Sequence, residues 1–305
     1  MKESFRAPDR PGENGAGRVL VVSPLAERLR SGEGARASSK EVDGRLVSLV
    51  ARDSFEAEQY RGLRLMVERM HKPGEGTVVA VCSPAPGDGK SITAINLAGA
   101  LAQDLDAQVL LIEADLHRPA STINDYLKLR GMEPFGLVDI TMEPSLALED
   151  AVQRLRPFNL SVLLSGSHTD TPYEVLKSPR LEELLADARR RYDYVILDLP
   201  PVVPVPDCRL VEEWIDGFFM VVAAHQTPRR MLEEALNLIK PEKVLGLVFN
   251  GHDRMDSMYY GYDRAYAYSG SKGRKKRHGE QAPAPKKGAK LRPWGGAGVS
   301  PRRNG

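Results

Sequence analysis

The sequence predicts a doubly wound α/β fold built on a mostly parallel sheet. Between Thr77 and Asn250 the 305-residue chain alternates short, continuous apolar runs with segments whose apolar residues recur at helical spacing. Continuous β-branched runs are typical of parallel strands that helices cover on both faces. A glycine-rich turn follows the first run, at the end of a strand, where open α/β sheets bind their ligands.

The elements follow one another in a regular order. A helix is expected over residues 52–70, where Phe55, Leu63, Met66, Val67 and Met70 recur at helical spacing. Six strands are expected after it, in TVVAVCS (77–83), QVLLIEA (108–114), LSVLLSG (160–166), YVILD (194–198), FFMVVAA (218–224) and KVLGLVFN (243–250). The expected helices between them begin at Ser91 or lie near residues 180–191, 207–214 and 229–240.

The two ends of the chain differ from this central part. Residues 1–45 are rich in Pro, Gly, Ser and Arg, which predicts a flexible segment before a folded domain of residues 46–252. Five of the ten tyrosines cluster in residues 253–268. Residues 269–305 hold eleven Lys/Arg and one acid, which leaves 32 basic and 40 acidic residues elsewhere. The net charge of +2 is therefore the sum of about −8 on the rest of the chain and about +10 on this tail, which is predicted to be disordered.

Several classes of protein are excluded. The two cysteines, Cys82 and Cys208, provide neither a disulfide framework nor zinc-ligand spacing, which indicates a reducing cytosol and no structural metal site. The N-terminus has charge, Pro and Gly where a signal peptide needs an apolar core. The apolar run at 217–224 is far too short to span a bilayer. The chain is therefore expected to be cytoplasmic.

The turn after the first strand, SPAPGDGKS (83–91), predicts a phosphate-binding loop. Glycines let the backbone approach phosphates, the following helix N-terminus supplies positive potential, Lys90 reaches the β and γ oxygens, and Ser91 can ligate Mg²⁺. Pro84 stands where the strict pattern has its first glycine, and a plain Gly/Pro turn is the alternative. The expected nucleotide-binding residues here are Pro86, Gly87, Asp88, Gly89, Lys90, Ser91 and Ile92.

Acidic residues end two later strands. VLLIEADLHRP (109–119) carries Glu113 and Asp115, and YDYVILDLPP (192–201) carries Asp198. An apolar strand that closes on a carboxylate is the Walker B arrangement, in which the acid orders Mg²⁺ opposite the phosphates. Any one such acid is equally explained as a solvated turn residue or helix cap. Together with the glycine loop, they indicate a nucleotide site with Asp198 as the Mg²⁺ acid.

These motifs resemble those of the bacterial tyrosine kinases, the P-loop autokinases of capsule and exopolysaccharide synthesis. The family's patterns are S-x-x-P-G-E-G-K-[ST], LLIDADLRRP and VILDTPP, and this chain has SPAPGDGKS, LLIEADLHRP and VILDLPP. The resemblance runs from about Ser54 to Asn250 and includes TPYEVLKS (171–178) and LVFN (247–250). It implies a P-loop NTPase fold of the deviant Walker A type, like that of MinD and ParA.

The resemblance implies an ATP- and Mg²⁺-dependent tyrosine autokinase. Its catalytic residues would be Lys90, Glu113, Asp115 and Asp198, its metal ligands Ser91, Asp198 and Glu113, and its adenine contact Asn250. The C-terminal cluster would be autophosphorylated at Tyr259, Tyr260, Tyr262, Tyr266 and Tyr268. The family's ring-forming E-x-x-R-x-x-R motif appears as Glu58, Arg61 and Arg64, which step by three along one helical stripe. An ordinary charged helix face is the alternative for that stripe, and an aromatic docking patch is the alternative for the tyrosines.

Two residues depart from the family pattern. Glu113 replaces the first Asp of LLIDADLRRP, and the added methylene can displace a carboxylate by about 1 Å, which can cost on the order of a hundredfold in rate. His117 replaces the first Arg of the usual pair and leaves Arg118. The expectation is therefore a working but slow kinase.

Two other functions remain as alternatives. A positioning ATPase of the ParA or MinD type would carry a signature lysine where this chain has Ala85, and would use its terminal helix on a membrane or a basic surface on DNA. A catalytically weak, nucleotide-gated scaffold of polysaccharide assembly is the other alternative, and Glu113 motivates it.

The expected partners follow from the resemblance. They are a separate membrane-embedded activator of the polysaccharide co-polymerase type, which would recruit the chain to the inner face of the membrane, a phosphotyrosine phosphatase, and further copies of the chain in a ring. The N-terminal segment is one candidate docking element for the activator. Nucleic acid is not an expected partner.

Autophosphorylation is predicted to weaken binding of the chain to anionic surfaces. Each phosphotyrosine adds about −1.5 to −2 charges, so five would nearly cancel the adjacent tail of about +10. Co-sedimentation with anionic vesicles at low salt should therefore fall after incubation with ATP. Equal binding of the phosphorylated and unphosphorylated chains would contradict this.

Overall fold

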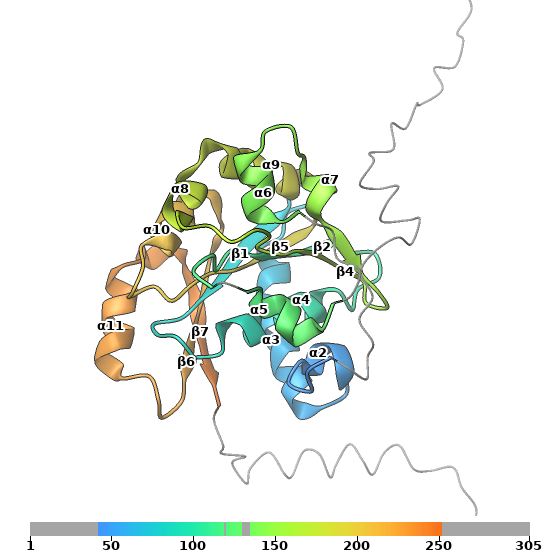
Figure 1. Cartoon of the computed structure of the whole chain (residues 1–305). Coiled ribbons are helices and arrows are strands. Elements are labelled where there is room, and N and C mark those ends of the chain that lie inside the picture. Colours follow the sequence, from blue (N-terminus) through green and yellow to red (C-terminus); the bar gives the residue numbers. More distant parts are fainter. Residues whose placement is uncertain (1–41, 119, 130–134, 252–305) are drawn as a thin grey trace, which may run out of the picture. The chain divides into compact units, whose positions relative to one another are not determined.

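A computed structural model describes residues 42–118, 120–129 and 135–251 of the chain (Figure 1). Residues 1–41 of the expected N-terminal segment (1–45), the tyrosine cluster (253–268) and the basic tail (269–305) all lie outside these residues. Within the described part, seven strands form one sheet in the order β3-β4-β2-β5-β1-β6-β7. All neighbours are parallel except β3 and β4. The expected doubly wound, mostly parallel α/β fold is confirmed.

The strands are β1 (Thr77–Cys82), β2 (Val109–Glu113), β3 (Gln153–Leu155), β4 (Leu160–Leu163), β5 (Tyr194–Asp198), β6 (Gly217–Ala223) and β7 (Val244–Asn250). The α-helices are α2 (Val47–Val50), α3 (Phe55–Met70), α4 (Lys90–Leu101), α5 (Thr122–Leu127), α6 (Leu137–Met142), α7 (Leu148–Ala151), α8 (Pro172–Lys177), α9 (Pro179–Arg191), α10 (Asp207–Val211) and α11 (Arg229–Asn237). Two 3₁₀ turns, η1 (Glu212–Trp214) and η2 (Pro241–Lys243), complete the described elements.

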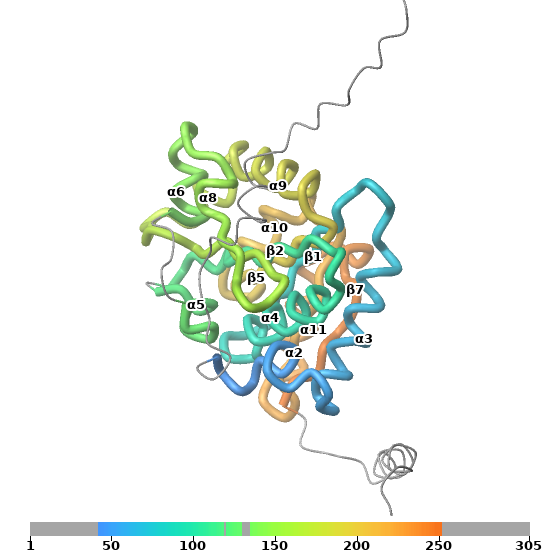
Figure 2. The backbone as a smooth tube through the Cα atoms, turned by 90° about the vertical axis from the view of Figure 1, so that its right-hand side faces the viewer, coloured from blue at the N-terminus to red at the C-terminus, as the bar shows by residue number. Residues whose placement is uncertain are grey.

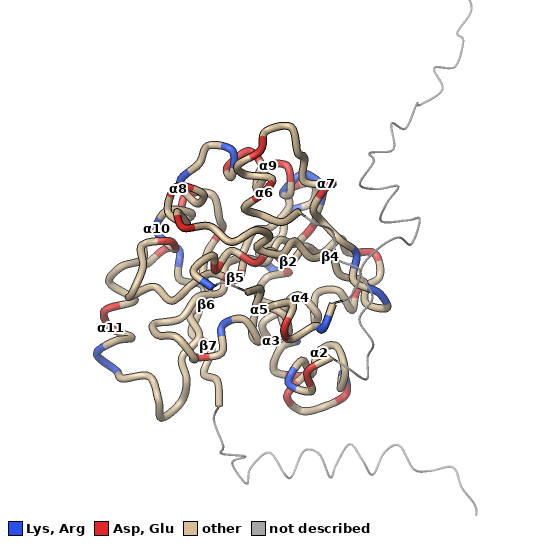
Figure 3. Tube along the Cα trace, viewed as in Figure 1, with Lys and Arg blue, Asp and Glu red and all other residues tan. Residues whose placement is uncertain are grey.

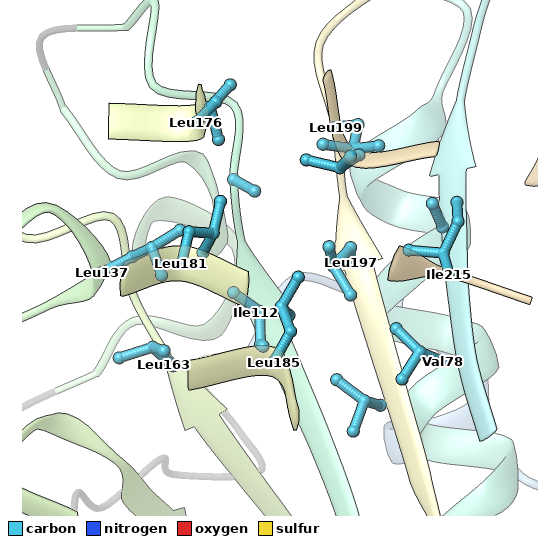
Figure 4. Close-up of a cluster of buried hydrophobic side chains, with 14 of the residues drawn as sticks. Val78, Ile112, Leu137, Leu163, Leu176, Leu181, Leu185, Leu197, Leu199 and Ile215 are labelled. Carbon is cyan, nitrogen blue, oxygen red and sulfur yellow. The ribbon is translucent and has the colours of Figure 1, made fainter. Parts of the chain in front are cut away.

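The helices divide between the two faces of the sheet. Buried side chains of α6 to α11 pack with one face, and those of α2 to α5 pack with the other. Figure 2 shows α6, α8 and α9 on one side and α2 and α4 on the other. In the first cluster, Leu181 and Leu185 of α9 lie beside Ile112 of β2 (Figure 4). β1, β2, β5 and β6 are buried along their whole length, as continuous apolar strands require.

Several short elements were not expected from the sequence. α2, α5, α6, α7 and α8 have only four to six residues each, and β3 has three. Helices this short are marginal by themselves, so tertiary contacts fix them and periodicity gives no signal. The packed body also starts earlier than residue 46, because Val42 is buried and the Asp43 amide donates to the Tyr126 carbonyl at 3.1 Å.

Charged residues lie along the helices and loops of the described part, whereas both cysteines are buried. Lys and Arg residues are interspersed with Asp and Glu residues (Figure 3). Cys82 and Cys208 are both buried and free. The Cys82 thiol and burial raise the pKa of Cys208 well above its ordinary value, so the Cys208 sulfur stays protonated. None of the described helices is both long and apolar enough to cross a membrane.

Buried Asn96 holds the first described residues against α4. Its side-chain oxygen accepts from the Ser48 amide at 2.9 Å, and its amide donates to the carbonyls of Arg45 and Ile92 at 3.0 Å each. The contact fixes α2 against the helix that follows the glycine loop.

Asn96→Ala should destabilise the domain by about 1–3 kcal/mol, because it leaves buried backbone groups without partners. Denaturant unfolding would measure this loss, and limited proteolysis should cut faster near residues 42–50. The control is exposed Asn237→Ala, which should change stability by less than about 0.5 kcal/mol. Equal effects of the two changes would contradict the anchoring role of Asn96.

Candidate functional site

The carboxyl ends of three neighbouring strands form the candidate site. β5 lies between β2 and β1, so the two acidic strand ends and the glycine loop are adjacent. In register, Asp198 pairs with Glu113 on one side and with Val81 on the other. The loop starts directly after β1. The sheet thus brings together three motifs that are spread over residues 83–201 of the sequence.

The loop has the backbone shape of a phosphate cradle. Gly87 and Gly89 have φ values of +90° and +97°, which side-chain-bearing residues rarely adopt. A Cβ on Gly89 would also clash with the side-chain amide of Asn250. α4 starts at Lys90 without a side-chain cap, so its first amides are available to an anion. Pro86 and Gly87 are exposed at the tip of the loop, and Ile92 packs against the core.

Asp88 gives the loop its internal support. One carboxylate oxygen accepts from the Ala85 amide at 2.9 Å, and the other accepts from the Thr227 hydroxyl at 2.7 Å. The Thr227 oxygen in turn accepts from the Ala223 amide at the end of β6, at 2.9 Å. The Asn250 amide donates to the Asp88 carbonyl at 3.0 Å. The Asp88 side chain therefore shapes the loop, and β6 and β7 both hold it in place.

Lys90 is buried between two carboxylates. Its ammonium lies 2.6 Å from an oxygen of Asp115, 3.8 Å from an oxygen of Asp198 and 3.4 Å from the Ser91 hydroxyl. Burial lowers the pKa of Lys90, but Asp198 and Asp115 outweigh that effect and hold its pKa above the ordinary value. Lys90 is therefore a fixed positive charge where the phosphates of a nucleotide would lie.

Asp198 is a buried carboxylate without a hydrogen bond. Its side chain is fully buried, and neither oxygen has a hydrogen-bond partner within the described ranges. Burial raises its pKa to about 6, against the lowering effect of Lys90. Such a group is costly unless a ligand completes it. With the Ser91 hydroxyl nearby, it offers the hard oxygen donors that suit Mg²⁺, which usually takes one or two carboxylates and phosphate oxygens.

Glu113 is used differently from the sequence expectation. Its carboxylate accepts from the Ser121 hydroxyl at 2.5 Å, the Ile123 amide at 3.0 Å and the Ser165 amide at 3.1 Å. These donors belong to the start of α5 and to the loop after β4. In this structure Glu113 therefore anchors α5, because its longer side chain reaches that helix, and it makes no hydrogen bond or ion pair with Lys90.

The end of the same motif makes two further contacts. The Arg118 guanidinium lies 3.8 Å from the Asp115 carboxylate, and Nε2 of His117 lies 2.8 Å from Oδ2 of Asp207. Asp207 is the first residue of α10 and is buried, whereas 37% of the His117 side chain is exposed. An imidazole supported by a buried carboxylate therefore stands two residues after Asp115.

Comparisons with known proteins place this geometry in a family. The family model described as an AAA domain matches residues 76–206. The tyrosine-protein kinase YwqD of Bacillus subtilis is 33% identical over 237 residues, which cover 77% of this chain and 95% of that protein. The chain belongs to the bacterial tyrosine-kinase family. The sequence-based resemblance is thereby confirmed.

Other members of the bacterial tyrosine-kinase family differ in length. The succinoglycan biosynthesis transport protein ExoP of Rhizobium meliloti is 31% identical over 231 residues, which cover 73% of this chain but 28% of ExoP. Among solved structures, the chimerical protein CapA2B2 matches with a TM-score of 0.62 and 25% identity, over 70% of this chain and 93% of that chain. The kinase fold therefore spans most of the described residues.

The residues that the sequence predicted to form a ring contact lie on α3. Glu58 and Arg61 pair with each other and stay substantially exposed. Arg64 donates to Glu68 at 2.6 Å and to the Ala100 carbonyl at 2.9 Å, and 22% of its side chain is exposed. Arg64 therefore binds α3 to the end of α4, while Glu58 and Arg61 remain accessible to another molecule.

Four residues of the site were not found by sequence reasoning. Thr227, Ser121, Ser165 and Asp207 act by supporting Asp88, Glu113 or His117. They come from loops and helix starts, and none stands in a recurring pattern. Only the Pro-Asp step before Cys208 signals a helix start, and that signal does not point to a partner.

Asp198→Asn should stabilise the nucleotide-free protein at pH 7.5. The folded pKa of Asp198 is about 6 and its ordinary value is 3.8, so its contribution is favourable below pH 4 and is lost as pH rises through 6. The lost stability corresponds to about 3 kcal/mol at neutral pH, and the gain in the variant is smaller because Lys90 loses an anionic neighbour. Denaturant unfolding in EDTA should show a gain of about 1–3 kcal/mol at pH 7.5.

The same gain should shrink as pH falls towards 4, where Asp198 is protonated. Asp170→Asn serves as the matched control, because the Asp170 side chain is 98% exposed, and it should have little effect at either pH. If Asp198→Asn instead destabilised the protein at pH 7.5, the buried Asp198 carboxylate would not be a source of instability.

Proposed function

We propose that the chain is an ATP-dependent protein-tyrosine kinase that transfers the γ-phosphate of ATP to the tyrosines of its own C-terminal cluster. The observation that carries the proposal is the position of Lys90, beneath the glycine loop and between the carboxylates of Asp115 and Asp198. Phosphoryl transfer depends mainly on positioning and on charge stabilisation, and these groups supply both. In this proposal the chain regulates exopolysaccharide or capsule synthesis and export.

Nucleotide binding would begin with the loop and Lys90. The glycine backbone, the first amides of α4 and the Lys90 ammonium would hold the β- and γ-phosphates. Without nucleotide, the ammonium lies on Asp115. Phosphate oxygens would compete for that ammonium, so binding would release the Asp115 carboxylate to hold the incoming tyrosine hydroxyl. Asn250, which contacts the loop at Asp88, would meet the adenine.

Ser91 and Asp198 would hold Mg²⁺ in this proposal. Bound there, the ion would neutralise charge on the β- and γ-phosphates. Asp198 is the better supported of the two residues, because its oxygens are otherwise unpaired. Glu113 was expected as a third ligand and as a catalytic acid. Its three hydrogen bonds with α5 and the loop after β4 favour a supporting role instead.

The partners in this proposal follow from the family. ExoP is longer than the region that it shares with this chain, which covers 28% of ExoP. We propose that a separate membrane-embedded co-polymerase activates this chain and recruits it to the inner face of the membrane, and that a phosphotyrosine phosphatase reverses the reaction. Glu58 and Arg61 would contact the next copy in a ring, and Tyr259, Tyr260, Tyr262, Tyr266 and Tyr268 would be presented to the neighbour's site.

The positioning-ATPase alternative has less support. ParA-type enzymes need a lysine at the place of Ala85, whose amide instead donates to Asp88. No cation can reach a partner's phosphate from that position. The weak-scaffold alternative depended on Glu113. Only a measurement of phosphotyrosine incorporation separates it from the kinase.

Mass-spectrometric mapping of phosphotyrosine after incubation with Mg-ATP tests the proposal. The wild-type chain should acquire phosphate on the clustered tyrosines. Lys90→Met should lower incorporation by at least about a hundredfold, because it removes the charge that stabilises the transferring phosphoryl group. The control, exposed Lys177→Met, should retain wild-type incorporation.

Asp115→Asn should retain nucleotide binding but lose at least about tenfold in incorporation rate, since it removes a carboxylate that acts on the tyrosine. A wild-type chain that never acquires phosphotyrosine, with or without its activator, would favour the scaffold.

A further inference from the structure

His117 and Asp207 form a hydrogen-bonded pair beside the candidate site. His117 stands in the segment LLIEADLHRP, two residues after Asp115. Here Nε2 of His117 lies 2.8 Å from Oδ2 of Asp207. The Asp207 carboxylate is 2% exposed and comes from α10, so a different element of the fold supports the imidazole.

The pair fixes the chemistry of the imidazole ring. A carboxylate only accepts hydrogen bonds when ionised, so Nε2 carries the proton that it donates to Asp207. The other ring nitrogen, Nδ1, then carries a free lone pair. Within the described ranges no group is hydrogen-bonded to Nδ1, and 37% of the side chain is exposed. His117 therefore offers a basic atom to a molecule that arrives from outside.

The carboxylates of the same motif are already engaged. Glu113 accepts three hydrogen bonds from Ser121, Ile123 and Ser165. Asp115 lies 2.6 Å from Lys90 and 3.8 Å from Arg118. Asp115 therefore already has two cationic partners in this structure.

The charged surroundings of His117 are mixed. Asp207 faces it from α10, Asp115 and Arg118 stand beside it in the same loop, and Lys90 and Asp198 lie beyond Asp115. Burial raises the pKa of Asp207, and His117 lowers it in turn. A proton taken up by His117 would lie beside the Asp207 carboxylate.

We propose that His117, oriented by Asp207, is the general base that accepts the proton of the acceptor tyrosine. This inference rests on the proposed kinase function. The phenol proton passes to Nδ1 while an oxygen lone pair forms the new bond to the γ-phosphorus. The bond from that phosphorus to the β–γ bridging oxygen breaks, and its electron pair leaves on ADP. The resulting imidazolium keeps its hydrogen bond with the Asp207 carboxylate.

His117→Gln tests this, because glutamine keeps a donor for Asp207 and removes the basic nitrogen. The full chain, with Mg-ATP, would be assayed on a tyrosine peptide across pH 5.5 to 8.5, from about one unit below to about two units above an ordinary histidine pKa. The rate should fall by about a hundredfold. In the variant, the rate should also no longer decrease as the pH is lowered. Affinity for Mg-ATP should stay within about twofold, since no phosphate contact is removed.

A fluorinated tyrosine peptide, whose phenol ionises near neutral pH, separates a base from a structural residue. Such a substrate needs no base, so His117→Gln should recover on it to within about tenfold of the wild-type rate. The matched control is His168→Gln, which alters a surface histidine 3.5 Å from exposed Asp170 and should match wild type on both peptides.

An equal decrease in phosphorylation rate on both peptides would overturn the assignment of the base. A wild-type pH profile in His117→Gln would overturn it as well. A wild-type chain that phosphorylates neither peptide would instead overturn the kinase function, and this inference with it.

Discussion

The placement of one ammonium group, that of Lys90, determines most of the architecture described above. A buried cation requires anionic partners, and Asp115 and Asp198 supply them from β2 and β5. Those strands must therefore be neighbours of each other and of the strand that leads into the glycine loop. The order β2-β5-β1 satisfies this requirement. Asp198 has the ion pair with Lys90, 3.8 Å away, but no hydrogen bond among the described residues, so its buried carboxylate favours the approach of a further cation.

Around this centre, the fold uses supporting contacts from distant parts of the chain. β6 and β7 hold the loop through Thr227 and Asn250, α2 holds the back of α4 through Asn96, and Glu113 fixes α5. The substitution of Asp by Glu in the second motif thus has a physical explanation. The longer side chain gives up the reacting centre and gains three donors at a helix start, and a histidine supported by its own carboxylate stands nearby.

The sequence predicted the sheet, the loop and the positions of Lys90 and Asp198, because continuous apolar runs and glycine spacing report local backbone requirements. It did not predict the orientation of Glu113, which depends on where α5 starts, nor the partnership of His117 with Asp207, residues ninety positions apart. Nor did it predict the hydrogen bond of Arg64 with the Ala100 carbonyl of α4. The partner of each of these side chains depends on which groups lie close to it in the folded structure. Residue spacing along the sequence does not give those distances. The clustered tyrosines lie outside the described residues, so their role rests on the sequence.

The contact between Asn250 and the glycine loop also sets a limit on geometry. β7 ends at the loop, and Tyr259 follows Asn250 after nine residues. An extended chain covers at most about 3.3–3.6 Å per residue, so nine residues span at most about 30 Å. A linker of that length gives two groups joined by it an effective concentration in the millimolar range. For the proposed autophosphorylation, alignment of the tyrosine in a site, rather than diffusion of a separate substrate, would therefore limit the rate.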